Sequence, residues 1–230
     1  MEIDSAVLSV SAQCVGFRFV VDPRDSVWRL HAFRGNGICR GLLGWVVTEP
    51  HVEGGVPVEV GGAIARVLCR SFSLDFTYTG EPPSPDIASV RRLRSPLVAR
   101  WLSNRGDISM AHTTHASFAQ RMFDSGLSWT QQAQIVFLSP PAASPPPLSA
   151  QQVYDVLECK VTDIGALMET LGVAGVMLAG VDGDFAEFIF PSSALLTDLI
   201  AAFENECAGS GLEWRVVSED EFKQTTWLVR

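Results

Sequence analysis

The segment SPPAASPPPLSA, residues 139–150, separates two parts of the chain that differ in composition. Its five prolines favour an extended backbone and cannot donate hydrogen bonds, so the segment is expected to be a semi-rigid linker. A structureless loop of this length inside one domain would be unusual. The sequence therefore predicts two small α+β domains, residues 1–138 and 151–230, joined by this linker.

The negative charge of the chain comes from its C-terminal part. Residues 1–140 contain 13 Arg, no Lys and 12 acidic residues, a net charge of +1. Residues 141–230 contain four basic and 14 acidic residues, a net charge of −10, which gives the total of −9. Nucleic-acid binding is not expected, because affinity for phosphate backbones comes largely from Lys and Arg. A basic protein surface is the natural complement.

Composition places the chain among globular proteins. With 47% apolar and 19% charged residues, it can bury a core. No apolar run approaches the ~20 residues needed to cross a bilayer, so no membrane contact is expected. The start, Met1 to Asp4, lacks the basic region of a secretory signal. The five cysteines are scattered and form no C-x-x-C pair, as expected for buried thiols in a cytoplasmic protein.

The N-terminal part is expected to be β-rich, with helices following. Alternating apolar side chains predict strands over residues 15–21 and 73–79, and an apolar run predicts another over 42–48. Pro57 favours an edge strand over 56–60. Residues 63–72 fit either a helix or a strand.

Two serine–proline pairs predict the start of helices. Ser84-Pro85 and Ser95-Pro96 each combine a capping serine with proline at the first helical position. The first helix should run to about Leu93, and the second should carry an apolar stripe and end at Gly106. A third helix is expected over residues 114–125. The stripe of the second helix consists of Leu97, Val98, Trp101 and Leu102.

The C-terminal part is expected to be an antiparallel sheet with helices on one face. Thr162 caps a predicted helix that Gly172 terminates. Asp182-Gly183 is a hairpin signal between the apolar runs 173–181 and 185–190. Pro191-Ser192 begins a second helix, and strands are expected over 212–217 and 225–229.

His112 and His115 are the candidate metal or catalytic residues. On a helix, residues three apart share one face, so the two imidazoles could bind one metal ion or take part in acid–base chemistry. The sequence contains no H-E-x-x-H motif and no nearby cysteine. A helix start with solvated histidines is the simpler interpretation. No cofactor motif is present, and none is predicted.

Four arginines, Arg91, Arg92, Arg94 and Arg100, form a candidate anion site. Arginine forks bind carboxylates and phosphates bidentately. The alternatives are a solvated helix face, a site for phosphate or RNA, an acidic protein surface, or contact with the acidic C-terminal part of the same chain.

An acidic and aromatic segment forms the candidate partner-binding surface. It comprises Glu213, Trp214, Glu219, Asp220, Glu221 and Phe222. Inhibitor and immunity proteins bind basic targets by charge steering and burial of aromatic anchors. The leading expectation is therefore a non-catalytic module, an inhibitor, immunity or adaptor protein, whose acidic C-terminal domain binds a basic partner.

Two alternatives come from other classes. One is a metal-assisted hydrolase or phosphoesterase that uses His112 and His115. The other is a structural subunit of a larger assembly, which would expose an apolar patch instead of an acidic one.

Overall fold

The strands among the described residues pair in one antiparallel sheet. The computed structural model describes residues 6–10, 15–22, 39–47, 58–79, 90–103, 105–124, 135–157, 161, 163–179, 185–191, 193–210 and 212–216. Within these residues the strand order is β10-β1-β2-β3-β9-β8-β7-β4-β6-β5. The strands are β1 Ala6–Val10, β2 Val15–Asp22, β3 Cys39–Val47, β4 Ser73–Thr79, β5 Val90–Leu93, β6 Ile108–Thr113, β7 Ile135–Ser139, β8 Gly175–Ala179, β9 Phe185–Phe190 and β10 Leu212–Val216. Helices combined with an antiparallel sheet confirm the α+β class.

Strands from both sides of the proline-rich segment are interleaved in this sheet. β7, which ends at Ser139, pairs with β4 on one side and with β8 from the C-terminal part on the other. β9, also from the C-terminal part, pairs in turn with β3 from the N-terminal part. The structure therefore does not confirm the predicted division into residues 1–138 and 151–230.

The proline-rich segment contacts the body of the protein. Pro146 and Leu148 are buried. Ser73 Oγ donates a hydrogen bond of 3.2 Å to the carbonyl of Pro140, and Arg91 Nη1 donates one of 3.3 Å to the carbonyl of Pro146. Prolines cannot donate to a sheet, but their carbonyls still accept hydrogen bonds, so a proline-rich segment can be held against a fold.

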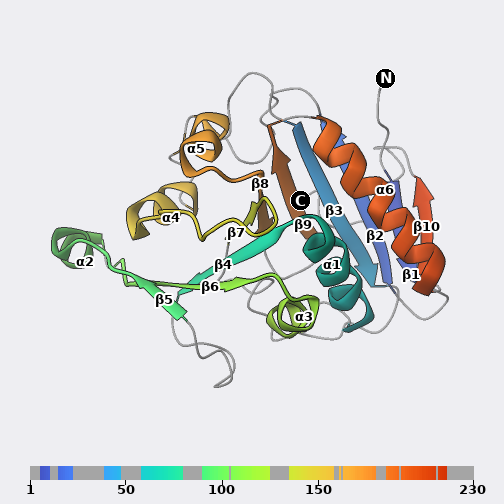
Figure 1. Cartoon of the computed structure of the whole chain (residues 1–230), viewed down its shortest axis with the longest axis horizontal. Coiled ribbons are helices and arrows are strands. Elements are labelled where there is room, and N and C mark those ends of the chain that lie inside the picture. Colours follow the sequence, from blue (N-terminus) through green and yellow to red (C-terminus); the bar gives the residue numbers. More distant parts are fainter. Residues whose placement is uncertain are drawn as a thin grey trace.

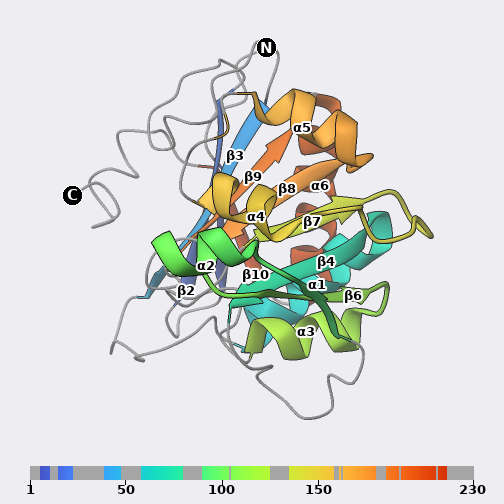
Figure 2. The ribbon, with the colours of Figure 1, turned by 90° about the vertical axis from the view of Figure 1, so that its left-hand side faces the viewer.

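Five of the six described helices cover the two faces of the sheet (Figure 1). On one face lie α1 (Val58–Ser71), α3 (Ala116–Asp124) and α6 (Ser193–Ser210). On the other face lie α4 (Ala150–Leu157) and α5 (Ile164–Leu171), which Figure 2 shows toward the viewer. The prediction that the C-terminal helices share one face is wrong, because α6 packs opposite α4 and α5.

The sixth helix, α2 (Leu97–Ser103), belongs to neither layer. Figure 1 shows it at the left-hand end of the molecule, beyond β5, which is the last strand of the described sheet. None of its residues belongs to either core cluster of the described residues. This placement makes α2 the most isolated helix of the fold.

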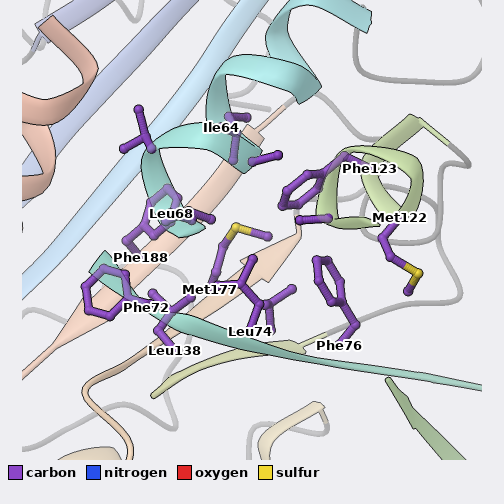
Figure 3. Packing of buried hydrophobic residues seen from close by; sticks show 14 of the residues in the cluster. Ile64, Leu68, Phe72, Leu74, Phe76, Met122, Phe123, Leu138, Met177 and Phe188 are labelled. Atoms are coloured by element: carbon purple, nitrogen blue, oxygen red, sulfur yellow. The ribbon is translucent and has the colours of Figure 1, made fainter. Parts of the chain in front are cut away.

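Alternate residues of the central strands build two cores, one on each face. On β7, Val136 and Leu138 join the core under α1, α3 and α6, whereas Ile135 and Phe137 join the core under α4 and α5. Figure 3 shows the first of these cores, in which Met177 of β8 lies among residues of α1, β4 and β9. Both cores combine residues from before and after the proline-rich segment.

Several local predictions are confirmed. On β4, Leu74, Phe76 and Tyr78 are all buried in one core, as the alternation predicted. β8 and β9 pair as the predicted antiparallel hairpin. α5 ends at Gly172, whose φ of 66° is the left-handed conformation that glycine adopts without strain. The N-terminal cap of α5, however, is Asp163 instead of the predicted Thr162, and it accepts a hydrogen bond of 2.9 Å from the amide of Ala166.

Other local predictions are wrong. Residues 90–93 form β5 instead of the end of a helix, because they pair with β6 and bury Leu93 in the second core. This tertiary contact overrides the helix propensity of arginine and leucine. Residues 58–60 form the first turn of α1 instead of an edge strand. β6 was not predicted, and the expected strand over 225–229 lies outside the described residues.

Candidate functional site

α2 presents its apolar stripe to solvent. The helix begins after Pro96, whose carbonyl accepts a hydrogen bond of 3.1 Å from the amide of Arg100. Residues i, i+1, i+4 and i+5 of a helix lie on one side, so its four large apolar residues form one face. The exposed fractions are 81% for Leu97, 66% for Val98, 87% for Trp101 and 71% for Leu102. The sequence predicted this stripe but not its exposure to solvent.

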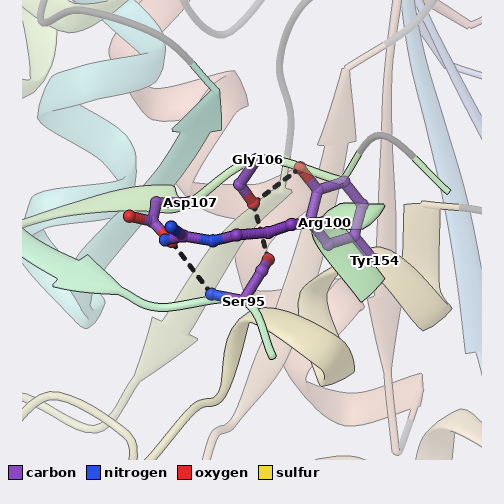
Figure 4. Close-up of polar contacts among 5 residues, drawn as sticks. All are labelled: Ser95, Arg100, Gly106, Asp107 and Tyr154. Atoms are coloured by element: carbon purple, nitrogen blue, oxygen red, sulfur yellow. Dashed lines mark hydrogen bonds and ion pairs between the residues drawn. The ribbon is translucent and has the colours of Figure 1, made fainter. Parts of the chain in front are cut away.

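A hydrogen-bonded base fixes the two chain segments that enter and leave α2 (Figure 4). Asp107 Oδ1 accepts hydrogen bonds from the backbone amide of Ser95, at 3.0 Å, and from the guanidinium of Arg100. Ser95 Oγ donates to the carbonyl of Gly106 at 2.6 Å, and Tyr154 Oη of α4 donates to the same carbonyl at 3.0 Å. Hydrogen bonds from Arg100 and from the Ser95 amide lower the pKa of Asp107. This carboxylate therefore stays charged in its role as acceptor.

Arg105 joins this base to α4. Its side chain is buried, and it donates a hydrogen bond of 3.2 Å to Gln151 Oε1. Its Nη1 also lies 3.9 Å from Asp155 Oδ1, and its guanidinium lies 5.2 Å from the centre of the Tyr154 ring. These contacts attach the segment that follows α2 to α4, so the support of α2 is joined to the body of the protein.

The flanks of α2 are positively charged. Residues 90–107 contain five arginines and one aspartate, a net charge of +4 in a chain of net charge −9. Arg91 and Arg92 lie on β5, Arg94 follows it, and all three side chains are exposed. Arg100 instead forms an ion pair with Asp107. The predicted arginine cluster is therefore divided between a strand, a loop and α2, and does not share one helix face.

His112 and His115 do not share a helix. His112 lies on β6, where its Nδ1 is 2.9 Å from Oδ1 of the fully buried Asp75 on β4. Burial raises the pKa of Asp75, and the hydrogen bond and charge of His112, together with the charge of Arg91, act in the opposite direction. His115 is exposed and precedes α3. The described residues contain no group of three His, Cys, Asp or Glu that could hold a metal ion.

One carboxylate of the C-terminal part is buried. Glu206 of α6 is 8% exposed, and its oxygens lie 2.5 Å from Arg66 Nε and 2.7 Å from Arg70 Nη2, both on α1. Glu213 and Trp214 lie on β10, but their side chains are outside the described part of the structure. Glu219, Asp220, Glu221 and Phe222 lie outside the described residues.

The exposure of α2 was missed because an apolar stripe at helical spacing normally indicates burial in the protein's own core. The only hint in the sequence was the density of arginine around the stripe.

No family model, curated protein or solved structure matches this chain. Its function must therefore be inferred from its own residues. Among the described helices, none combines the length and apolar character that a membrane span requires.

Proposed function

We propose that this chain is a non-catalytic protein-binding module, an adaptor or a subunit of a larger assembly, that contacts its partner through α2. The observation that carries the proposal is the exposure of four large apolar side chains on one helix. Contiguous apolar surface of this kind is typical of protein contact sites. Tryptophan is among the residues that contribute most to binding when a partner covers them.

The fixed support of α2 adds to this argument. A helix that must fold or reorient on binding loses conformational entropy at that step, which weakens the complex. The hydrogen bonds among Ser95, Arg100, Gly106, Asp107 and Tyr154 order α2 before any partner arrives. Such an arrangement suits a docking element.

The acidic surface of the C-terminal part remains a separate hypothesis, with a basic partner and an inhibitor or immunity role. The described residues do not test it, because the side chains of Glu213 and Trp214 and the whole of residues 219–222 lie outside the described part of the structure. Moreover, an exposed apolar patch is the feature expected of the subunit alternative. We therefore place the contact on α2.

Acid–base catalysis is a second candidate, favoured by one contact. His112 is oriented by Asp75 in the way that a carboxylate orients a catalytic histidine. Asp75 is fully buried, so only the histidine side of the pair could reach a substrate. His115 does not share a helix face with His112, which lies on β6, so the two histidines are not paired as predicted. Among the described residues, no group of three possible metal ligands is present.

The test is site-specific crosslinking in the cells that make the protein. Trp101 is replaced by the photoreactive p-benzoylphenylalanine, and a matched control carries the same group at Thr197, which is exposed on α6. We expect a protein adduct from position 101 that is absent from position 197. Unlabelled wild-type protein should compete for it, and the Trp101→Ala variant should not. Absence of any adduct at 101, or equal adducts at both positions, would contradict the proposal.

A further inference from the structure

We infer that the partner receives α2 in an apolar groove bordered by carboxylates. This inference rests on the proposed function and adds the chemistry of the partner to it. The first argument is charge. Residues 90–107 have a net charge of +4, so the rest of the chain has a net charge of −13, from −9 minus +4. The segment that contains α2 is thus positively charged within an otherwise acidic chain, and Asp155 of α4, 3.9 Å from Arg105, offsets one of its charges.

Two of these arginines, Arg92 and Arg94, are available to a partner, whereas Arg91 already donates a hydrogen bond to the carbonyl of Pro146. Arg100 and Arg105 already lie beside Asp107 and Asp155. The exposed Arg92 and Arg94, by contrast, form no ion pair with any described residue. Arginine binds carboxylates bidentately, so carboxylates at the edge of the partner's site complement these side chains.

The small size of α2 favours a groove over a flat surface. A helix of seven residues is about 10 Å long. If each of the four apolar side chains carries on the order of 150 Å², their exposed parts offer roughly 450 Å². A stable interface buries about 800 Å² on each partner. A groove can bury about 800 Å² of this chain, because it also contacts the sides of the helix and the arginines beside it.

A second copy of this chain fits α2 less well. In a two-fold symmetric dimer with α2 on the axis, α2 would meet α2 and the arginines of both copies would be brought together. Like charges at an interface are unfavourable. The stripe alone also provides too little area for such a dimer.

Anionic membranes and nucleic acids also fit less well. Both are extended polyanions, so they would face the acidic remainder of the chain as well as α2. Carboxylates around one groove act only locally, because charges in physiological salt are screened beyond about 8 Å. A protein site with carboxylates only at its border therefore attracts the arginines beside α2 without repelling the acidic rest of the chain.

The test uses the full chain and the protein captured at position 101. Association rates are measured between 50 and 500 mM NaCl for the wild type, for Arg94→Gln and for Arg121→Gln. Arg121 is the matched control, since it is exposed on α3, away from α2. We expect the wild-type rate to fall with salt. Arg94→Gln should associate about threefold more slowly at 50 mM but equally fast at 500 mM, and Arg121→Gln should follow the wild type.

The outcomes separate this inference from the proposed function. If position 101 captures no protein, both fail. If position 101 captures a protein whose association rate changes neither with salt nor with Arg94→Gln, the inference fails and the proposed function stands. Binding to phosphatidylserine vesicles or to single-stranded RNA, or a dimer in sedimentation, would also overturn the inference if Trp101→Ala abolished it.

Discussion

Replacing Trp101 by alanine is expected to leave the stability of the fold almost unchanged. The residue is 87% exposed, so only 13% of its surface is covered. For a side chain of about 200 Å² this corresponds to roughly 26 Å², or about 0.7 kcal/mol at 25 cal/mol per Å². The higher helix propensity of alanine offsets part of this loss. The melting temperature of a 230-residue chain should therefore shift by less than about 3 °C.

Urea unfolding followed by circular dichroism at 222 nm measures this quantity without relying on tryptophan fluorescence. The matched comparison is Phe203→Ala, an aromatic-to-alanine change at a fully buried position of α6, which should cost about 3–5 kcal/mol. A loss of more than about 2 kcal/mol in Trp101→Ala would refute the reasoning. It would mean that Trp101 packs against the protein in solution and that the α2 face is not free.

Three further substitutions test the fold away from α2. Glu206→Gln should cost about 1–2 kcal/mol, because a buried carboxylate loses its charge opposite two half-exposed arginines. Glu204→Gln, on the exposed side of the same helix, should stay within about 0.5 kcal/mol, and equal effects of the two substitutions would argue against the ion pairs. Burial raises the pKa of Asp75 above its ordinary 3.8, so the folded state holds the carboxyl proton more tightly than the unfolded state, and the wild type loses stability as the pH rises above 3.8. Asp75→Asn, which cannot ionise, should therefore become more stable relative to the wild type over this pH range. Parallel plots of stability against pH for the two proteins, from pH 3 upward, would contradict this sign. Gly175→Ala should cost about 1–3 kcal/mol, since the new Cβ would lie 2.5 Å from the ring of Phe190, and an unchanged urea midpoint would show that this close approach is absent.

The elements that could be predicted from the sequence are those with local signals. The alternation on β4, the paired apolar runs of β8 and β9 and the glycine after α5 are each contained within a few residues. The predicted division into domains was not confirmed, because it depended on which strands pair. β7 pairs with β8 across 35 residues or more of chain, and β3 pairs with β9 across more than 130, and no local pattern encodes either contact.

For the candidate site, the sequence predicted the helix but not the direction of its apolar face. Ser95-Pro96 marked the start of α2, and the apolar spacing marked its stripe. The periodicity of the apolar residues, however, predicts only that this helix face is buried, and not whether the same chain or a partner buries it. His112 was misplaced for a related reason, because its pairing with Asp75 requires β6 to lie beside β4.

The energetics of α2 explain why its apolar face and its charged flanks should act together. Burying roughly 450 Å² of apolar surface contributes about 11 kcal/mol at 25 cal/mol per Å². The loss of translational and rotational freedom on association costs about 4–15 kcal/mol. The stripe alone therefore gives a marginal complex. The fixed base lowers the ordering cost, and the arginines beside α2 raise the rate of encounter with a carboxylate-bordered site. A partner that contacted only the apolar face would not associate faster because of the arginines. The salt dependence of the association rate is therefore the decisive measurement.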